Sequence, residues 1–551
     1  MHLDQIAVRL GEFGPYQRQK YFLMCLFSTL SAFHAVNMVF IGAEQKHHCN
    51  VPVTNVSTTA NYNLSQEEII DLFIPPRDSC HHYNVEERLS QFEVAEYNLT
   101  DILVTQDNVS LVSCTSGYNY VRSQYVTTIT SDFNLVCENK YWRSTSSSVF
   151  FAGRLVGALV FGQLSDRFGR RPMFFVGVLT LLIAGIVASL APNIFVFLPM
   201  YFLQGAAHTG AFLVAFTLST ELVGPNYRVF AGFVIQIFYG FGYVCLSGLA
   251  YFIREWRYLE LAITLPAVLF GVYWWLLPES IPWLLSRGRD DEAEVILLKA
   301  AKQNGVTLEP DVIRAMKADT ALKGEKKQYS FIDCLRTWNM ALLSLNVWFN
   351  WLVNSFVFYG IALNSENLSG NPYLNFSLMG IVSIAAYILC LLLVNRTGRR
   401  LSLITSMCLA GLACIVSSFF ITQDGPAMKI LVKVFVLLGK FCITASYSII
   451  YLMAAELFPT VVRNIGMGVA SMSARIGGIF APFVLELKVV WGAYPLLVFG
   501  ALSILSGLLA LFLPETSHQP LPQTLDDVKN RRHGLRCLKK SKKIELAVLK
   551  A

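Results

Sequence analysis

The chain alternates between long apolar stretches and short polar connections over most of its length. One apolar stretch covers residues 21–43, and eleven more lie near 146–164, 172–190, 194–218, 230–252, 257–277, 340–363, 377–394, 401–421, 428–453, 464–486 and 492–513. A helix needs about 20 apolar residues to cross the hydrocarbon core of a bilayer. The pattern therefore predicts an all-α polytopic membrane protein with twelve transmembrane helices.

The composition supports a membrane protein over a soluble enzyme or a disordered chain. Hydrophobic residues make up 54% of the 551 positions and charged residues 15%, against about 25% charged residues in soluble domains. The net charge of +7 is modest for this length and does not indicate a nucleic-acid partner. Residues 1–20 lack the uninterrupted apolar core of a signal peptide, so we expect a retained cytosolic amino terminus.

Lysine and arginine are concentrated in two polar segments, ten of them in residues 281–340 and nine after Pro514. Because these residues are retained on the cytosolic side of short loops, we expect a cytosolic linker at 281–339 and a cytosolic tail at 514–551. Residues 144–280 then complete the first half of the protein, and 340–513 form the second half. The segment 44–143 contains more acids than bases, which predicts an extracellular loop.

That predicted loop carries the marks of an oxidising, glycosylating compartment. It contains four N-x-S/T sequons, at Asn55, Asn63, Asn98 and Asn108, and four cysteines, Cys49, Cys80, Cys114 and Cys137. Four cysteines predict two disulfides with three possible connectivities. Two histidine pairs, 47–48 and 81–82, would permit a metal site, but solvent-exposed loop residues are the simpler interpretation, and we predict no metal site.

Three short motifs recur in the same order in the two halves. GQLSDRFGRRP (162–172) matches LVNRTGRRLS (393–402), ELVGPNYR (221–228) matches ELFPTVVR (456–463), and PES (278–280) matches PET (514–516). The offsets of 229, 235 and 236 residues are nearly one period. This predicts two homologous six-helix halves.

The repeated motifs contain the charges expected of a cytosolic gate. Gly169 and Gly398 allow tight turns between antiparallel helices. Acids and arginines of the two halves could pair when the cytosolic ends of the halves touch, and the pairs would break when the halves move apart. Such pairs would act as a latch between two conformations. The other interpretation is that the arginines only fix the membrane topology. The residues assigned to this gate are Asp166, Arg167, Arg170, Arg171, Glu221, Arg228, Arg399, Arg400, Glu456 and Arg463.

With these motifs the chain resembles the major facilitator superfamily and, within it, the organic ion transporter family of organic cation, organic anion and carnitine transporters. Further matching segments are GEFGPYQ (11–17), DFNLVC (132–137), TELVGPNYRV (220–229), PESIPWLLSRGR (278–289), AAELFPTVVRNIGMG (454–468) and LPETSHQPLPQTLDD (513–527). The resemblance implies a plasma-membrane transporter that moves small organic ions through the lipid bilayer by alternating access, without a cofactor. A phosphate-binding GxxxxGK[ST] motif is absent from the sequence.

The resemblance also bears on the charge of the substrate. Arg475 lies in the middle of an apolar stretch, at a position that is typically acidic in cation transporters of this family and arginine in its anion and carnitine transporters. A second acidic position of the cation type is Ser383 here, and Tyr387 stands where the anion subgroup tends to have lysine. The sequence thus favours an organic anion or a carnitine-like zwitterion, with an organic cation as the alternative. Arg475 could instead be a structural strut paired with Glu486 or Glu456.

Aromatic residues at positions matched by the resemblance complete the expected binding site, since rings attract quaternary ammonium groups and stack on flat anions. The candidates are Tyr239, Trp351, Phe358, Tyr359, Tyr387 and Tyr447. His34 and Asn37 are weaker candidates, for which a hydrogen-bonded contact between helices is the plainer account.

Three positions depart from the family pattern or carry an unexplained charge. Arg154 places a cation where relatives usually have an apolar residue, Asn395 replaces a common acid in the second-half motif, and Lys440 could pair with a buried acid. A transporter-like receptor that binds without transport is a rival hypothesis. An enzyme is not expected, because the chain has no metal-ligand cluster, nucleophile elbow or cofactor motif.

Overall fold

The computed structural model describes residues 3–51, 70, 72–75, 78–87, 109–307, 330–423, 425–517, 519, 522, 523, 525 and 527. They belong to two compact units, which are described separately. The helical unit comprises Met1–Val39, Thr145–Phe252 and Tyr258–Ala551, and the loop unit comprises Phe40–Ser144 and Ile253–Arg257. The four sequon asparagines and the side chain of Asn395 lie outside the described residues.

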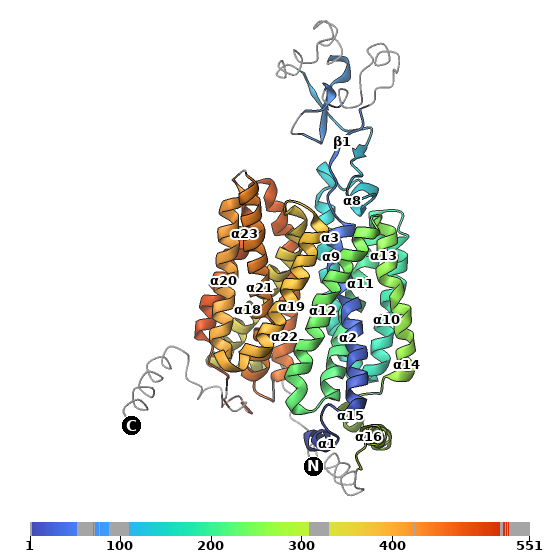
Figure 1. Ribbon diagram of the computed structural model, residues 1–551, viewed down its shortest axis with the longest axis vertical. Coiled ribbons are helices and arrows are strands. Elements are labelled where there is room, and N and C mark those ends of the chain that lie inside the picture. The colour runs from blue at the N-terminus through green and yellow to red at the C-terminus, as the bar shows by residue number, and fades with distance from the viewer. Residues whose placement is uncertain are drawn as a thin grey trace, which may run out of the picture. The chain divides into compact units, whose positions relative to one another are not determined.

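Twelve long helical segments are present among the described residues (Figure 1). Ten of these segments are long and apolar enough to cross a membrane, and α11 and α21, of 29 and 32 residues, complete the set. The predicted fold class is confirmed, although the first helix begins six residues earlier than the apolar pattern indicated. The segments are α2 (Pro15–Val36) with α3 (Met38–Ile41), α9 (Tyr141–Phe168), α10 (Arg170–Ser189), α11 (Ile194–Leu222), α12 (Arg228–Phe252), α13 (Trp256–Thr264) with η4 (Leu265–Val272) and α14 (Tyr273–Leu276), α18 (Trp338–Leu363), α19 (Pro372–Thr397), α20 (Arg399–Ile421), α21 (Pro426–Leu457), α22 (Arg463–Glu486), and α23 (Tyr494–Leu509) with η8 (Ala510–Phe512).

The helical contacts repeat between the two halves of the chain. Helix α2 packs against α11 and α12, and α10 packs against α11; in the second half α18 packs against α21 and α22, and α20 packs against α21. The helices of each half gather together in Figure 1, blue to green for the first and yellow to red for the second. The sequence repeat thus corresponds to a repeat in packing.

Among the described residues, the helix pairs through which the two halves of the helical unit meet include α12 with α19 and α9 with α22. On the first pair, the Tyr243 and Phe376 rings stack at 5.1 Å, and the Ser247 hydroxyl donates to the Tyr373 carbonyl at 2.5 Å. On the second, the Ser148 hydroxyl donates to the Ile479 carbonyl at 2.7 Å. These contacts hold helices of different halves side by side.

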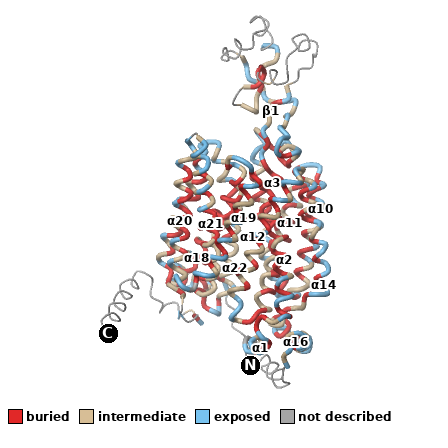
Figure 2. The backbone as a smooth tube through the Cα atoms, in the orientation of Figure 1, coloured by how far each residue is buried: buried red, intermediate tan, exposed pale blue. Residues whose placement is uncertain are grey.

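The outward faces of the helices are apolar, as a bilayer requires. On α10, Val176, Leu179 and Ile183 are exposed at a spacing of three to four residues, which places them on one helical face. Figure 2 shows exposed positions alternating with buried ones along the helices. Contiguous apolar surface of this extent is unfavourable in water, so the exposed faces fit a multi-pass membrane protein.

The ends of the helices that carry Gly169 and Gly398 are here called the motif end, and a small cluster lies at this end of the first half, with Trp283 beside Gly169. It joins α1 (Leu3–Arg9) to α15 (Ile281–Ser286) and α16 (Asp290–Asn304) through a shared apolar core. The Asn304 side chain accepts from the Tyr16 amide at 2.9 Å and donates to the Leu10 carbonyl at 2.8 Å. The first part of the predicted linker therefore packs against the amino terminus. Shorter elements are η3 (Pro225–Tyr227), η5 (Phe331–Cys334), η6 (Asn364–Asn367) and η7 (Leu487–Val489).

The described residues of the loop unit form two short antiparallel strand pairs and contain two disulfides. Strand β1 (His47–Cys49) pairs with β4 (Tyr118–Tyr120), and β2 (His81–Tyr83) pairs with β3 (Leu111–Ser113). The disulfides join Cys49 to Cys114 and Cys80 to Cys137, one of the three possible connectivities. The unit also contains α8 (Ile129–Asp132) and η2 (Cys137–Asn139).

The histidine pairs of the loop unit make local contacts. His47 lies beside the Cys80–Cys137 disulfide, whose sulfurs are bonded to each other. His81 contacts Asp78, with 2.7 Å between Nδ1 and Oδ2. His82 is buried, with Nδ1 2.8 Å from the Tyr83 carbonyl oxygen, so the expectation of a solvent-exposed side chain is wrong for this residue.

Candidate substrate site and gate motifs

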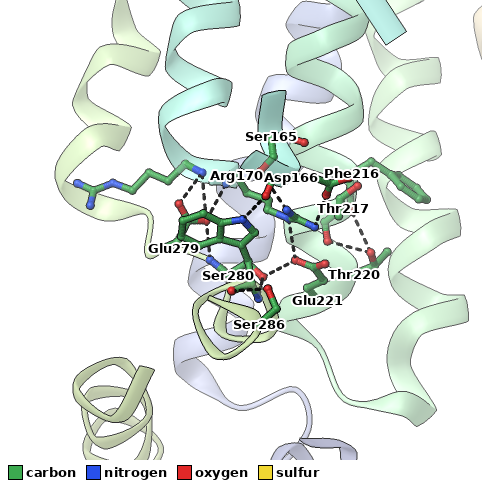
Figure 3. A network of polar contacts seen from close by, with 12 residues as sticks. Ser165, Asp166, Arg170, Phe216, Thr217, Thr220, Glu221, Glu279, Ser280 and Ser286 are labelled. Carbon is green, nitrogen blue, oxygen red and sulfur yellow. Dashed lines mark hydrogen bonds and ion pairs between the residues drawn. The ribbon is translucent and has the colours of Figure 1, made fainter. Parts of the chain in front are cut away.

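Arg170 is the centre of a charge network at the motif end of the first half. Its guanidinium lies 2.9 Å from an Asp166 carboxylate oxygen and 3.7 Å from a Glu221 carboxylate oxygen. Figure 3 shows Arg170 between these two acids, which come from α9 and α11. One arginine at the start of α10 therefore ties three consecutive helices together.

Glu279 closes the same network from the chain that follows α14. Its carboxylate accepts backbone N–H groups of Arg170 at 2.9 Å, Arg171 at 3.2 Å and Ser280 at 2.8 Å (Figure 3). The first N–H groups of a helix have no partner within the helix and attract negative charge. Gly169 has φ 106°, and a Cβ there would collide with the Glu279 carboxylate. Glycine is thus required for both the turn and the close approach.

The second half repeats this arrangement. The Arg399 guanidinium lies 3.4 Å from the Glu456 carboxylate. Glu515 accepts the backbone N–H groups of Arg399 at 2.9 Å and Arg400 at 3.1 Å. Gly398, with φ 80°, faces the Glu515 carboxylate as Gly169 faces Glu279. The two motif sets have the same structural use.

These ion pairs connect helices within one half, whereas the sequence interpretation placed them between halves. The remaining gate arginines also have local contacts. Arg167 lies over the Phe168 ring and Arg171 over the Trp274 ring, while Arg463 donates to the Phe458 carbonyl at 3.2 Å. Arg228 is the first residue of α12, and Arg400 donates to the Leu511 carbonyl at 2.5 Å.

Sequence reasoning missed the roles of Glu279 and Glu515. The signal was present, because Pro-Glu-Ser and Pro-Glu-Thr recur at one repeat period. What the sequence did not reveal is that each glutamate reaches back more than 100 residues to cap a helix start. That contact depends on the antiparallel packing of the helices.

Arg154 lies where helices of the two halves approach each other, in a group of side chains here called the central cluster. Its guanidinium carbon is 5.2 Å from the centre of the Phe151 ring and 5.0 Å from that of Tyr359. Its Nε donates to the Thr209 hydroxyl at 3.1 Å. Among the described residues Arg154 forms no ion pair with a carboxylate, and its buried Nη1 has no hydrogen-bond partner.

Arg475, the leading sequence candidate, contributes a second cation to the central cluster. Its Nη1 donates to the carbonyl and hydroxyl oxygens of Ser471, one turn earlier on α22. Its buried Nε has no hydrogen-bond partner in the described part of the chain. The alternative strut partner Glu456 is instead bound to Arg399. Arg475 is therefore a guanidinium without a carboxylate among the residues that the structure describes.

Four aromatic candidates lie in the central cluster and contact one another. Trp351 lies 6.2 Å from Tyr447, Tyr447 lies 5.7 Å from Phe358, and Phe358 lies 5.2 Å from Tyr359, measured between ring centres. Tyr451, which the sequence did not single out, lies 4.0 Å from Trp351. It is four residues after Tyr447 and thus on the same helical face.

The other candidates extend the cluster toward α12 and α19. Tyr239 lies 5.9 Å from Tyr243, another residue that sequence reasoning missed. Tyr387 is buried on α19, and the Ser383 hydroxyl donates to the Met379 carbonyl at 2.7 Å. The Lys440 ammonium lies 3.2 Å from the centre of the Phe358 ring and donates to the Phe358 backbone carbonyl at 3.3 Å. The expected acidic partner of Lys440 is absent among the described residues.

Several polar atoms of the central cluster are buried without a hydrogen-bond partner in the described part of the chain. They are the hydroxyls of Tyr239 and Tyr243, Trp351 Nε1, Arg154 Nη1 and Arg475 Nε. Buried polar groups are normally hydrogen-bonded, since an unpaired group costs roughly 1–3 kcal/mol. Such atoms, grouped around two guanidinium groups that have no carboxylate partner among the described residues, fit a site for a polar ligand.

His34 and Asn37 lie apart from these rings, in a hydrogen-bonded network inside the first half. The Asn37 amide donates to Glu260 at 2.8 Å and accepts from the Tyr201 hydroxyl at 2.7 Å. His34 Nδ1 lies 3.2 Å from the Gln204 amide nitrogen. Both side chains are fully buried, which agrees with the plainer account of them as contacts between helices.

Comparison with known proteins supports the transporter fold. A family model described as sugar (and other) transporter matches residues 108–525. An organic cation transporter protein of Drosophila melanogaster is 40% identical, with 96% of this chain and 95% of the relative covered. The chain belongs to the organic ion transporter family of the major facilitator superfamily. It is therefore a transporter and not an enzyme.

Further relatives and solved structures agree with that membership. The human organic cation/carnitine transporter 2 is 34% identical, with 96% of this chain and 95% of the relative covered. The xylose transporter XylE of E. coli in a partially occluded inward-open conformation has a TM-score of 0.62 at 16% identity, covering 92% of this chain and all of that one. At 14% identity, the human organic anion transporter MFSD10 has a TM-score of 0.53, with 90% and 99% covered. The two structures support the fold alone.

Proposed function

We propose that this chain transports small quaternary ammonium compounds, and that carnitine-like zwitterions, which also carry a carboxylate, are the preferred subclass. The names of its relatives favour an organic cation over an organic anion, so they support the alternative interpretation of the sequence better than its main one. A flat organic anion is accordingly no longer the expected substrate.

The observation that carries the proposal is the pairing of two kinds of group in the central cluster. Arg475 and Arg154 have no carboxylate partner among the described residues, and a substrate carboxylate would supply one. Tyr447 and Trp351, whose ring centres lie 6.2 Å apart, offer aromatic faces to a quaternary ammonium group. The Phe358 and Tyr359 rings already lie against Lys440 and Arg154. A zwitterion satisfies both, whereas a simple cation leaves the arginines unpaired.

Uptake into cells that express the chain tests this proposal. Labelled carnitine, a quaternary ammonium compound without a carboxylate and a flat aromatic carboxylate would be compared in the wild type, Arg475→Gln and the surface control Arg289→Gln. Because a charge-assisted hydrogen bond contributes about 1.5–3 kcal/mol, Arg475→Gln should reduce carnitine uptake about 10- to 150-fold and spare the simple cation. Uptake of the flat carboxylate alone would contradict the proposal.

A simple organic cation is the second candidate, favoured by relatives named organic cation transporters without mention of carnitine. In that case the wild type would carry the carboxylate-free compound better than carnitine. Arg475→Gln would then leave uptake unchanged or raise it, because it removes a like charge from the site. The same experiment therefore separates the two candidates.

We also propose that the protein lies in the plasma membrane with both termini and the motif end in the cytosol. The lysine and arginine content of residues 281–340 and of the tail supports this orientation. The two disulfides and the four sequons support an extracellular position for the loop unit. In this arrangement the networks of Arg170 and Arg399 keep each half rigid while the halves move relative to each other.

A further inference from the structure

A second polar site lies inside the first half, within a part of the protein built from apolar helices. It contains His34 from α2, Asn37 directly after that helix, Tyr201 and Gln204 from α11, and Glu260 from α13. Each of these side chains is at most 1% exposed. Ionisable groups are rare at such positions, because burial of a charge is unfavourable, and they usually have a function.

Glu260 is held by amide donors and not by a cation. Its Oε2 accepts from the Asn37 amide at 2.8 Å, and its Oε1 accepts from the Gln204 amide at 2.5 Å. The nearest imidazole nitrogen, Nδ1 of His34, lies 4.0 Å from Oε1. Neither lysine nor arginine pairs with Glu260 in the described part of the chain. The carboxyl group can therefore be neutralised by a proton of its own or by a protonated His34.

The site contains two groups that can take up a proton. Each Glu260 carboxylate oxygen accepts one N–H group and keeps a further lone pair, and His34 can be protonated on its imidazole ring. The site is therefore assigned to a proton, and exchange of Na⁺ for K⁺ provides the test against a metal cation.

Three polar atoms beside the carboxyl group have no hydrogen-bond partner among the described residues. They are His34 Nε2, Gln204 Oε1 and Thr264 Oγ1. Gly185 of α10 permits the close packing here, because a Cβ at that position would lie 2.5 Å from Thr264 Oγ1 and 3.0 Å from Gln204 Nε2. The site is therefore a tightly enclosed polar pair with unused hydrogen-bonding capacity, as a group that gains and loses a proton requires.

A series of polar groups leads from this site to the central cluster. His208 lies one turn after Gln204 on α11 and therefore on the same face of that helix. Its Nε2 is 2.8 Å from the Ser31 hydroxyl, and its Nδ1 is 3.5 Å from the Thr209 hydroxyl. Thr209 in turn accepts from Arg154 at 3.1 Å. Ser31 lies three residues before His34 on α2, so these contacts bring polar groups from Arg154 to within one helical turn of His34.

We propose that Glu260 and His34 form a proton-binding site, linked through His208 and Thr209 to Arg154, and that one proton is bound and released there in each transport cycle. The claim that a proton binds at this site is independent of the proposed function. The claim that proton binding is coupled to transport rests on the proposed function. Among the described residues, the titratable groups beside the site are His34 from α2 and Tyr201 from α11. His208 from α11 lies one turn after Gln204, and Arg154 from α9 is reached through it and Thr209. Helix α10 contributes Gly185, which does not titrate.

The first test measures proton binding by the purified full-length protein in detergent. The unfolding equilibrium of the wild type, Glu260→Gln and the surface control Glu292→Gln would be followed between pH 5 and pH 9. A group that binds one proton in only one state changes this equilibrium up to tenfold per pH unit. We expect the unfolding equilibrium of the wild type and of Glu292→Gln to depend on pH in the same way. In Glu260→Gln this dependence should be weaker, by the amount that one bound proton contributes. Coincident profiles for all three proteins would overturn the proposal.

The same purified protein shows which ion binds. Replacing Na⁺ by K⁺ at constant pH should leave the unfolding equilibrium unchanged, and a stabilisation specific to Na⁺ that Glu260→Gln abolishes would overturn the assignment to a proton. If Glu260→Gln does not fold, His34→Gln should show the same loss of slope, and a slope equal to that of the wild type would count against the site.

The coupling is tested in proteoliposomes that contain a pH-sensitive dye. Addition of labelled carnitine should produce a proton flux through the wild type, and Glu260→Gln should abolish the flux or uncouple it from uptake. Carnitine uptake without a proton flux would overturn the coupling. A pH-dependent unfolding equilibrium in a protein that moves none of the three test compounds would support the proton site and contradict the proposed transport function alone.

Discussion

Replacement of Glu279 by glutamine tests whether the repeated motifs stabilise each half from within. Its carboxylate accepts three backbone N–H groups, from Arg170, Arg171 and Ser280, at 2.8–3.2 Å. Glutamine keeps one carbonyl oxygen of the same size but loses the negative charge. It also places an NH₂ group against backbone N–H donors, where it has nothing to donate to.

The expected magnitude follows from these contacts. Hydrogen bonds to a charged group contribute about 1.5–3 kcal/mol, against about 0.5–1.5 kcal/mol for neutral ones, and a negative charge at a helix start adds about 0.3–1 kcal/mol. Weakening of two of the three bonds together with loss of the charge should lower the free energy of unfolding by about 2–3 kcal/mol. That corresponds to roughly a 30- to 150-fold change in the unfolding equilibrium.

The assay is thermal unfolding of the purified variants, followed by intrinsic fluorescence. Glu515→Gln is the matched variant, because Glu515 accepts the equivalent N–H groups in the second half. Glu292→Gln is the control, because its ion pair with Arg289 is exposed and contributes little. Glu279→Gln and Glu515→Gln should each lower Tm by a few degrees. The reasoning is refuted if neither lowers Tm more than Glu292→Gln does.

Three further changes test other parts of the account. Tyr447→Leu removes a ring and should raise KM for a quaternary ammonium substrate about 3- to 30-fold in uptake kinetics, whereas Tyr447→Phe should have little effect; equal KM values would exclude the ring from the site. Serine at both Cys49 and Cys114 removes a disulfide that joins residues 65 apart and should destabilise the loop unit by about 2–4 kcal/mol, seen as faster limited proteolysis at its strands. Partial burial alone would raise the pKa of Asp78, but hydrogen bonds from the Cys80 amide and the His81 ring outweigh it and lower this pKa. The stability that Asp78 adds to the loop unit is therefore complete above the ordinary aspartate pKa of about 3.9 and is lost as the pH falls below it. In the same proteolysis assay, the cleavage rate of Asp78→Asn should therefore rise less at acidic pH than that of the wild type.

Much of the fold could be predicted from the sequence, because a helix in a membrane must be apolar over a fixed length. That constraint gives the number and order of the helices directly. The internal repeat then gives the two halves, since motifs recurring at one period require equivalent structures. Helix ends were less predictable: α2 begins at Pro15, six residues before the apolar run, because its first turns pack against α16 rather than lipid.

The candidate site was only partly predictable, because its members come together through packing between distant helices. Arg475 and Arg154 stood out as charges in apolar stretches. Glu260 is also a single acid in an apolar stretch and could have been singled out in the same way. The acids Asp166, Glu221 and Glu456 could be predicted as partners of the motif arginines. Which acid pairs with Arg170 and which with Arg399 could not, since sequence spacing does not show whether a charge faces its own half or the other one.

The most direct test of the central claim is exchange of carnitine across the membrane of proteoliposomes that contain the purified protein. Vesicles preloaded with unlabelled carnitine would be diluted into labelled carnitine. A carrier that works by alternating access should accumulate label faster in preloaded than in empty vesicles, and Arg475→Gln should reduce this exchange. Label that binds to the vesicles but never enters the lumen would contradict the account and identify a receptor without transport.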